Sequence, residues 1–239
     1  MVAATTRGAN ADARAVRSRF ALLEGLVGWA FLLVLAVSPV IFGANVPLAW
    51  AVNAVLVGLL IVWLVVQRAL THRSFAVARR RIDMPFVCLL LVAGWIALQA
   101  VPWTPAALHH PGWPQAAAIL GTSLDGAVSA NPDETWLGLL RFLTALGCGW
   151  LALQIGRDRL WARRILASVA IAGAIHALYA ISEQAMASRS ILWYARPYWQ
   201  IASGTFINAN HFAAYMALGI LAAMGLLLRD VGRNVILPP

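Results

Sequence analysis

Residues 48–66 read LAWAVNAVLVGLLIVWLVV, a run without a single charged side chain. A helix needs roughly 20 mostly apolar residues to cross the hydrocarbon core of a bilayer. The apolar residues of this run are continuous and do not alternate with polar ones, as they would in a strand of a membrane barrel. The run therefore predicts a membrane-spanning helix.

Comparable apolar runs occur along the rest of the chain. They cover about 22–42, 85–101, 136–155, 164–182 and 211–228. Of the 239 residues, 62% are hydrophobic and only 11% are charged, which is far from the balance of a soluble domain. We expect an all-α, polytopic transmembrane bundle of about six spans. Residues 21–239 are predicted to form one membrane domain, and residues 1–20, small, polar and basic, a disordered tail.

The arginines predict the orientation of these spans. The chain has 18 basic residues, all arginine, and 15 of them lie before span one, between spans two and three, between spans four and five, or after span six. Cytoplasmic segments carry the excess of basic residues in membrane proteins. Both termini are therefore predicted to be cytoplasmic, and segments 43–47, 102–135 and 183–210 to be external.

Several kinds of chemistry have no support in the sequence. Basic residues scattered between apolar runs do not form a nucleic-acid-binding face, although the net charge is +9. The chain has no P-loop, GxGxxG, HExxH, CxxC or GxSxG motif. Cys88 and Cys148 lie inside apolar runs and are interpreted as packing residues. We expect no metal site, no cofactor and no nucleic-acid partner.

Arg141 is an ionisable residue inside the fourth apolar run. Such a residue is costly in a membrane and usually faces a polar cavity or a partner. Arg141 follows Glu134 by two helical turns, and NPDETW places Asn131 as the N-cap of this helix. Two interpretations stay open: Arg141 lines a ligand-binding cavity, or it pairs with Glu134 or reaches the membrane interface.

The two longer external segments carry the other candidate residues. Asn208, Asn210 and His211 lie at the predicted start of the sixth span, where free backbone N–H groups favour an anion. Ordinary capping by an asparagine is the alternative. The preceding stretch SRSILWYARPYWQ contains four more candidate residues. Arg189 and Arg196 are suited to binding phosphate. Trp193 and Tyr198 are suited to packing against a sugar ring or to lying at the membrane interface.

His176 lies within the fifth apolar run and is interpreted first as a helix-packing residue. A buried polar group in a span is nevertheless often functional. Both interpretations are therefore kept for His176.

Residues 190–219, SILWYARPYWQIASGTFINANHFAAYMALG, resemble the O-antigen ligase and polymerase family. Its segment G-T-F-x-N-x-N-H-F-A-x-Y is matched by Gly204, Thr205, Phe206, Asn208, Asn210, His211, Phe212, Ala213 and Tyr215. FGANVPLAW after span one, LQAVPWTPAALHHPGW after span three and the sequence around span four are similar to the same family in content and order. The resemblance extends from about residue 20 to the end of the chain.

The resemblance implies a bacterial inner-membrane glycosyltransferase of lipopolysaccharide or polysaccharide biosynthesis. Such a protein takes a glycan from an undecaprenyl-diphosphate carrier at the periplasmic face and transfers it to lipid A-core or another acceptor. The bilayer and the lipid-linked glycan are then the expected partners. Arg141, Arg189, Arg196 and the start of span six would hold the diphosphate, with Trp193 and Tyr198 near the glycan, and no metal would be required.

The family's later half, with a large periplasmic loop bearing a histidine, has no counterpart after VGRNVILPP. We therefore expect the chain to be an N-terminal half, with the catalytic residues unassigned and a separately encoded C-terminal half as a candidate partner. Two alternatives stay open: a non-enzymatic transporter or export component for lipid-linked glycans, and an inactive truncated remnant.

Overall fold

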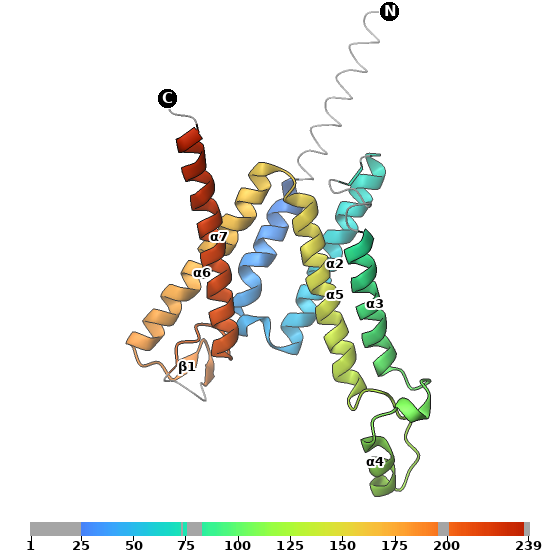
Figure 1. Ribbon diagram of the computed structural model, residues 1–239. Coiled ribbons are helices and arrows are strands. Elements are labelled where there is room, and N and C mark those ends of the chain that lie inside the picture. Colours follow the sequence, from blue (N-terminus) through green and yellow to red (C-terminus); the bar gives the residue numbers. More distant parts are fainter. Residues whose placement is uncertain (1–24, 73, 76–82, 196–200, 237–239) are drawn as a thin grey trace, which may run out of the picture. The chain divides into compact units, whose positions relative to one another are not determined.

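The computed structural model describes residues 25–72, 74–75, 83–195 and 201–236 (Figure 1). These residues are mostly helical, and the predicted helical fold class is confirmed to that extent. Five helices among them are long and apolar enough to cross a membrane: α2 Pro47–Leu70, α3 Asp83–Ala100, α5 Pro132–Ile155, α6 Arg159–Ala185 and α7 Ala209–Ile236. In α7 the candidate span covers Ala209–Val231. The chain is therefore a multi-pass membrane protein.

The described part of the helix before α2, Gly25–Val40, is apolar but shorter than a full span. We refer to it as the first helix. A total of six spans and cytoplasmic termini stay predictions. The predicted tail, residues 1–20, lies outside the described residues.

Large apolar side chains remain exposed on the helices that qualify as spans. Leu59 of α2, Leu91 of α3 and Leu228 of α7 are each more than 60% exposed. In the most apolar 18-residue segment of each of these helices, only between 11% and 22% is buried within the chain. A helix with apolar side chains on most of its circumference is suited to lipid or to burial against other protein.

The helices form two compact units, each described here by itself. The first unit contains residues up to 76 and from 150 onward, and the second contains residues 77–149. Helix α5 runs from the second unit into the first. A single membrane domain stays a prediction.

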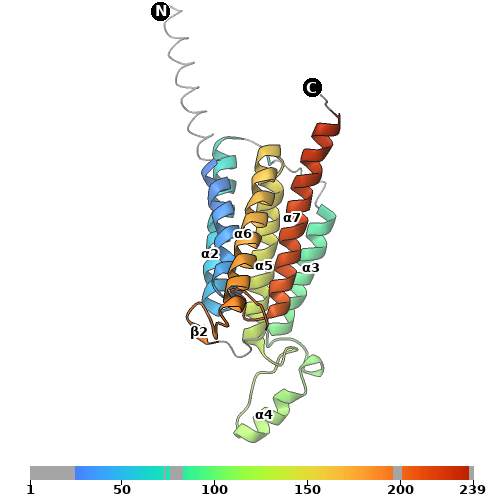
Figure 2. The ribbon, with the colours of Figure 1, turned by 90° about the vertical axis from the view of Figure 1, so that its left-hand side faces the viewer.

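Helices α6 and α7 lie side by side in the first unit (Figures 1 and 2). They approach closely where two glycines face each other: a Cβ added to Gly173 would lie 3.3 Å from the Cα of Gly219. Small residues allow this approach between membrane helices. The first helix also approaches α6 through a glycine, because a Cβ on Gly28 would come within 2.4 Å of the Trp161 ring.

A tight connection joins the first helix to α2. It contains two single 3-10 turns, η1 Ser38–Val40 and η2 Phe42–Ala44. Gly43 has a φ of +63°, which is readily adopted only by glycine. We call residues 38–46 the first hairpin loop.

The second unit contains α3, η4 Ala106–Leu108, α4 Gly112–Leu120 and most of α5. The short helix α4 lies beyond the ends of α3 and α5 (Figures 1 and 2). Hydrogen bonds tie the segment before α5 back to the rest of the unit. The Trp113 indole donates to the Ser129 carbonyl at 3.0 Å, and the Ser129 N–H donates to the Gln99 carbonyl at 2.8 Å.

Candidate functional site

A small β-hairpin lies at the end of α6 and the beginning of α7 (Figure 1). Its strands are β1 Ser190–Ile191 and β2 Tyr194–Ala195, paired antiparallel. Ile191 is almost fully buried, and Leu192 in the turn has a φ of +53°. This aromatic hairpin, residues 190–195, belongs to the stretch SRSILWYARPYWQ, which the sequence predicts to be external.

Two side chains of α6 hold the turn of the aromatic hairpin. The hydroxyl of Tyr179 accepts a hydrogen bond from the Leu192 N–H at 3.0 Å and donates to the carboxylate of Glu183. Glu183 is only 4% exposed. A buried carboxylate needs hydrogen-bond donors to offset its loss of hydration, and Tyr179 supplies one. The positive-φ turn of the hairpin is therefore held by the half-buried Tyr179, whose hydroxyl is bound by the buried Glu183 carboxylate.

The aromatic hairpin also packs on the first hairpin loop. The Phe42 ring lies edge-on to the rings of Trp193 and Tyr194, with centroids 5.3 and 5.7 Å apart. Such edge-to-face arrangements are favourable for aromatic pairs. Trp193 nevertheless remains 74% exposed, so most of its surface is available to lipid or a ligand.

The residues that carry the family resemblance enter the core of the first unit. Thr205 is 5% exposed, and its hydroxyl donates to the Pro39 carbonyl at 2.9 Å. Phe206 is 6% exposed and lies against Gly43, where an added Cβ would be 2.2 Å from the Phe206 ring. Gly204 has a φ of +54°. Gly204, Thr205 and Phe206 therefore join the first hairpin loop to α6 and α7 and are buried structural residues.

Two buried polar atoms lie beside Phe206. His176 of α6 is 4% exposed, and its ring contacts those of Phe206 and Tyr215, with centroids 6.2 and 5.4 Å away. Its Nδ1 bonds to the Ala172 carbonyl at 2.8 Å. Among the described residues, neither the Nε2 of His176 nor the Tyr215 hydroxyl has a hydrogen-bond partner.

His176 therefore combines both interpretations made from the sequence. One ring nitrogen is satisfied as in a packing histidine, and the other is buried without a partner within the described part of the chain. Unpaired polar groups of this kind are costly and are often functional in membrane spans. With Tyr215 beside it, His176 is a candidate for binding a ligand hydroxyl or moving a proton.

The start of α7 is capped by Asn208. Its side-chain oxygen accepts from the Asn210 N–H at 2.8 Å, and its carbonyl accepts from the Phe212 N–H at 3.1 Å. The capping interpretation is thus confirmed for Asn208. Asn208, Asn210 and His211 are all exposed, so they remain accessible to a ligand.

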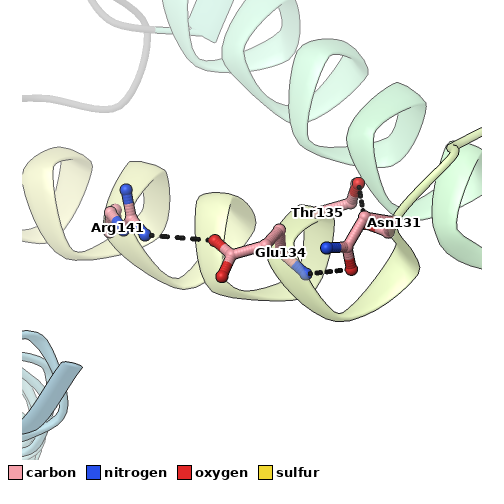
Figure 3. A network of polar contacts seen from close by, with 4 residues as sticks. All are labelled: Asn131, Glu134, Thr135 and Arg141. Atoms are coloured by element: carbon pink, nitrogen blue, oxygen red, sulfur yellow. Dashed lines mark hydrogen bonds and ion pairs between the residues drawn. The ribbon is translucent and has the colours of Figure 1, made fainter.

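Arg141 lies in the second unit, where the ion pair expected from its spacing is present (Figure 3). An Arg141 guanidinium nitrogen is 3.6 Å from a Glu134 carboxylate oxygen, and the side chains are 41% and 62% exposed. Asn131 caps α5 by accepting from the Glu134 N–H at 3.2 Å, as predicted. Pairing with Glu134 satisfies the structural interpretation, whereas ligand binding by Arg141 stays a prediction.

The structure brings several predicted site residues together in the first unit. Trp193 and the start of α7 both pack on the first hairpin loop. Trp193 contacts the Phe42 ring, and Phe206, which precedes α7, lies against Gly43. Arg189 precedes the aromatic hairpin and is exposed. Arg196 and Tyr198 lie outside the described residues.

Sequence reasoning did not identify Tyr179 and Glu183. Their signal was available, because a tyrosine and a glutamate four residues apart face each other on a helix and lie at the end of an apolar run. Among the described residues, no group of three or more His, Cys, Asp or Glu is placed to hold a metal ion. The described residues at the hairpin end of the first unit include an exposed arginine, aromatic rings, amides and a histidine.

No protein-family model, curated protein or solved structure matches the chain.

Proposed function

We propose that the chain is a component of an O-antigen ligase or polymerase-like glycosyltransferase of the bacterial inner membrane. In this proposal it binds an undecaprenyl-diphosphate-linked glycan at the periplasmic face. The supporting observation is the arrangement around the family-like segment. Gly204, Thr205 and Phe206 are buried, while the polar residues that follow and the aromatic hairpin remain accessible.

The distribution of charge in the first unit supports the proposed orientation. Arg68 lies in the last turn of α2, Arg159 begins α6, and an Arg229 guanidinium nitrogen is 3.4 Å from the Arg159 carbonyl. These arginines lie at the helix ends opposite those that meet the aromatic hairpin. With the basic ends in the cytoplasm, both termini would be cytoplasmic and the hairpin would be periplasmic.

The exposed groups near the hairpin match the chemistry of such a donor. Arg189 offers a guanidinium that can hold phosphate oxygens. The exposed face of Trp193 suits a sugar ring or the headgroup region. Asn210 and His211 at the start of α7 add hydrogen-bonding groups beside a helix N-terminus, which favours negative charge.

The test compares two tryptophans of equal exposure. Trp193 of the aromatic hairpin and Trp103 after α3 are each 74% exposed. In lipid nanodiscs, Trp193→Ala should weaken binding of an undecaprenyl-diphosphate-linked glycan roughly two- to tenfold, the loss expected for one aromatic contact. Trp103→Ala should leave it unchanged.

Equal losses in the two variants would mean that both tryptophans are interface anchors. Unchanged binding in Trp193→Ala would mean that the aromatic hairpin does not bind the donor. Either result would contradict the proposal.

A further inference from the structure

A groove of about 700 Å³ runs between the first helix and α6, both in the first unit. Its walls are almost entirely apolar and include Leu33 and Val40 from the first helix and Ile171 and Ile175 from α6. Leu33, Ile171 and Ile175 are each about 60% exposed. In a chain that crosses a membrane, an apolar groove of this kind suits an acyl chain.

One end of the groove is lined by a single charged side chain, Arg164. Its guanidinium lies over the rings of Trp29 and Trp161, 4.9 and 4.6 Å from their centroids. Cation–π contacts of this kind hold the guanidinium plane in place without using its N–H groups. Gly28 permits the arrangement, because a Cβ there would overlap the Trp161 ring.

Arg164 differs from its neighbour Arg163 in what it contacts. A guanidinium nitrogen of Arg163 is 3.7 Å from the Asp230 carboxylate. Within the part of the chain that the structure describes, the Arg164 guanidinium has neither a hydrogen-bond acceptor nor a carboxylate partner. Its N–H groups are therefore available to an anion at the end of the groove.

The surrounding charge also favours an anion. Arg159, Arg163 and Arg229 lie at the same end of the first unit, and two described acidic residues there, Asp158 and Asp230, already have partners. Asp158 caps α6 by accepting from the Leu160 and Trp161 N–H groups, and Asp230 faces Arg163. Basic pockets between membrane helices on the cytoplasmic side are typical sites for anionic lipid headgroups.

We propose that this groove binds an anionic glycerophospholipid. An acyl chain lies between the first helix and α6, and the phosphodiester is held by the guanidinium of Arg164. An apolar groove that ends at an arginine without a carboxylate partner among the described residues matches the two chemical parts of such a lipid. A packed protein helix would have to bring its own acidic residue to the same point. This proposal does not depend on glycan binding at the opposite end of the unit.

The experiment measures lipid retained by the purified protein. The full chain is reconstituted in bilayers of phosphatidylglycerol and phosphatidylcholine, and native mass spectrometry counts the lipids that remain bound after release. The wild-type protein should retain phosphatidylglycerol in preference to phosphatidylcholine. Arg164→Gln should lower the retained phosphatidylglycerol at least fivefold, and the matched control Arg163→Gln should change it less than twofold.

A second pair of variants tests the groove without changing charge. Ala36 lines the groove, so Ala36→Phe should fill part of it and reduce retained phosphatidylglycerol. Ala51 is exposed on α2 and does not line the groove, and Ala51→Phe should leave retention unchanged. This pair keeps the test decisive if Arg164→Gln reduces the yield of folded protein.

Three results would overturn the proposal. Equal losses in Arg164→Gln and Arg163→Gln would indicate general attraction by surface charge. Equal retention of both lipids by the wild type would indicate an unselective lipid shell. A wild-type dimer without bound lipid, converted to monomer by Ala36→Phe, would show that a second copy of the chain covers the groove.

Discussion

Helices α5 and α7 both begin after an asparagine, but the two starts are held in different ways. At α5 most of the bonds are local, although Ser129 is also bonded to Gln99 and to the Trp113 indole. Asn131 accepts from the Glu134 N–H, the Thr135 hydroxyl is 2.7 Å from that of Ser129, and it also donates to the Asn131 carbonyl at 3.0 Å. Residues 129–135 form most of the hydrogen bonds that define the start of this helix.

The start of α7 depends on distant residues. Asn208 makes the same kind of cap, but the residues just before it are fixed by the first hairpin loop. Thr205 donates to the carbonyl of Pro39, 166 residues away in the sequence, and Phe206 lies against Gly43. The position of the exposed Asn210 and His211 is thus coupled to the first hairpin loop.

The comparison shows that similar capping chemistry can serve two purposes. A local network makes a helix start that tolerates changes elsewhere. A helix start that is packed in the core, as in α7, depends on the conformation of a loop that is distant in the sequence. If a ligand binds at the start of α7, the first hairpin loop determines where its contacts lie.

Phe206→Ala should cause the largest loss of unfolding free energy among the variants that test this difference. Loss of a buried phenylalanine costs about 3–5 kcal/mol of unfolding free energy in well-packed cores. Trp136→Ala is the control at the start of α5, where Trp136 is 45% exposed, and it should cost about 1 kcal/mol or less. Unfolding in mixed micelles with increasing SDS, followed by circular dichroism, measures both. Equal losses would show that the start of α7 is no more dependent on the core than that of α5.

Two threonine-to-valine substitutions test the comparison by removing one hydroxyl at the start of each helix. Thr205→Val keeps the shape of the side chain but leaves the Pro39 carbonyl without its donor, which should cost about 1–3 kcal/mol. Thr135→Val should cost roughly 0.5 kcal/mol or less, because the Asn131 carbonyl still accepts from the Thr135 N–H and the Ser129 hydroxyl from the Asn131 N–H. The same SDS titration provides the measurement. A smaller loss in Thr205→Val than in Thr135→Val would contradict the proposed difference.

The two helix starts also explain what the sequence could predict. The α5 cap, Pro132 at its first position and the Arg141–Glu134 pair follow from spacing within one helix, and the structure contains all three. The packing of Thr205 and Phe206 on the first hairpin loop could not be predicted in this way, because Pro39 and Gly43 lie more than 160 residues earlier. Local patterns identify helices and caps, whereas the packing between distant loops requires the folded structure.

The candidate site shows the same limit. Asn210, His211 and Trp193 are exposed, as is typical of polar and aromatic residues next to an apolar run, and their role in binding stays a prediction. Tyr179 and Glu183 were missed because their role depends on the Leu192 N–H of the aromatic hairpin. Their i, i+4 spacing indicated a contact but not what the contact supports.

The smallest effect on stability is expected at the Arg141–Glu134 pair. Both side chains are substantially exposed, and exposed ion pairs contribute about 0.2–1 kcal/mol. Glu134→Gln should therefore lower the unfolding free energy by less than about 1 kcal/mol and leave the amount of protein in the membrane unchanged. Immunoblots of membrane fractions and the SDS titration test this expectation.

The same residues separate pairing from ligand binding. If Arg141 holds a diphosphate, Arg141→Lys should weaken donor binding several-fold, because an ammonium cannot reproduce the planar fork of a guanidinium, while Glu134→Gln should change binding much less. Donor affinity in nanodiscs and protein abundance are measured for both variants together with Arg141→Ala. Normal donor binding by Arg141→Lys would remove the ligand-binding interpretation. Equal losses of abundance in Glu134→Gln and Arg141→Ala would show instead that the pair holds α5 in place.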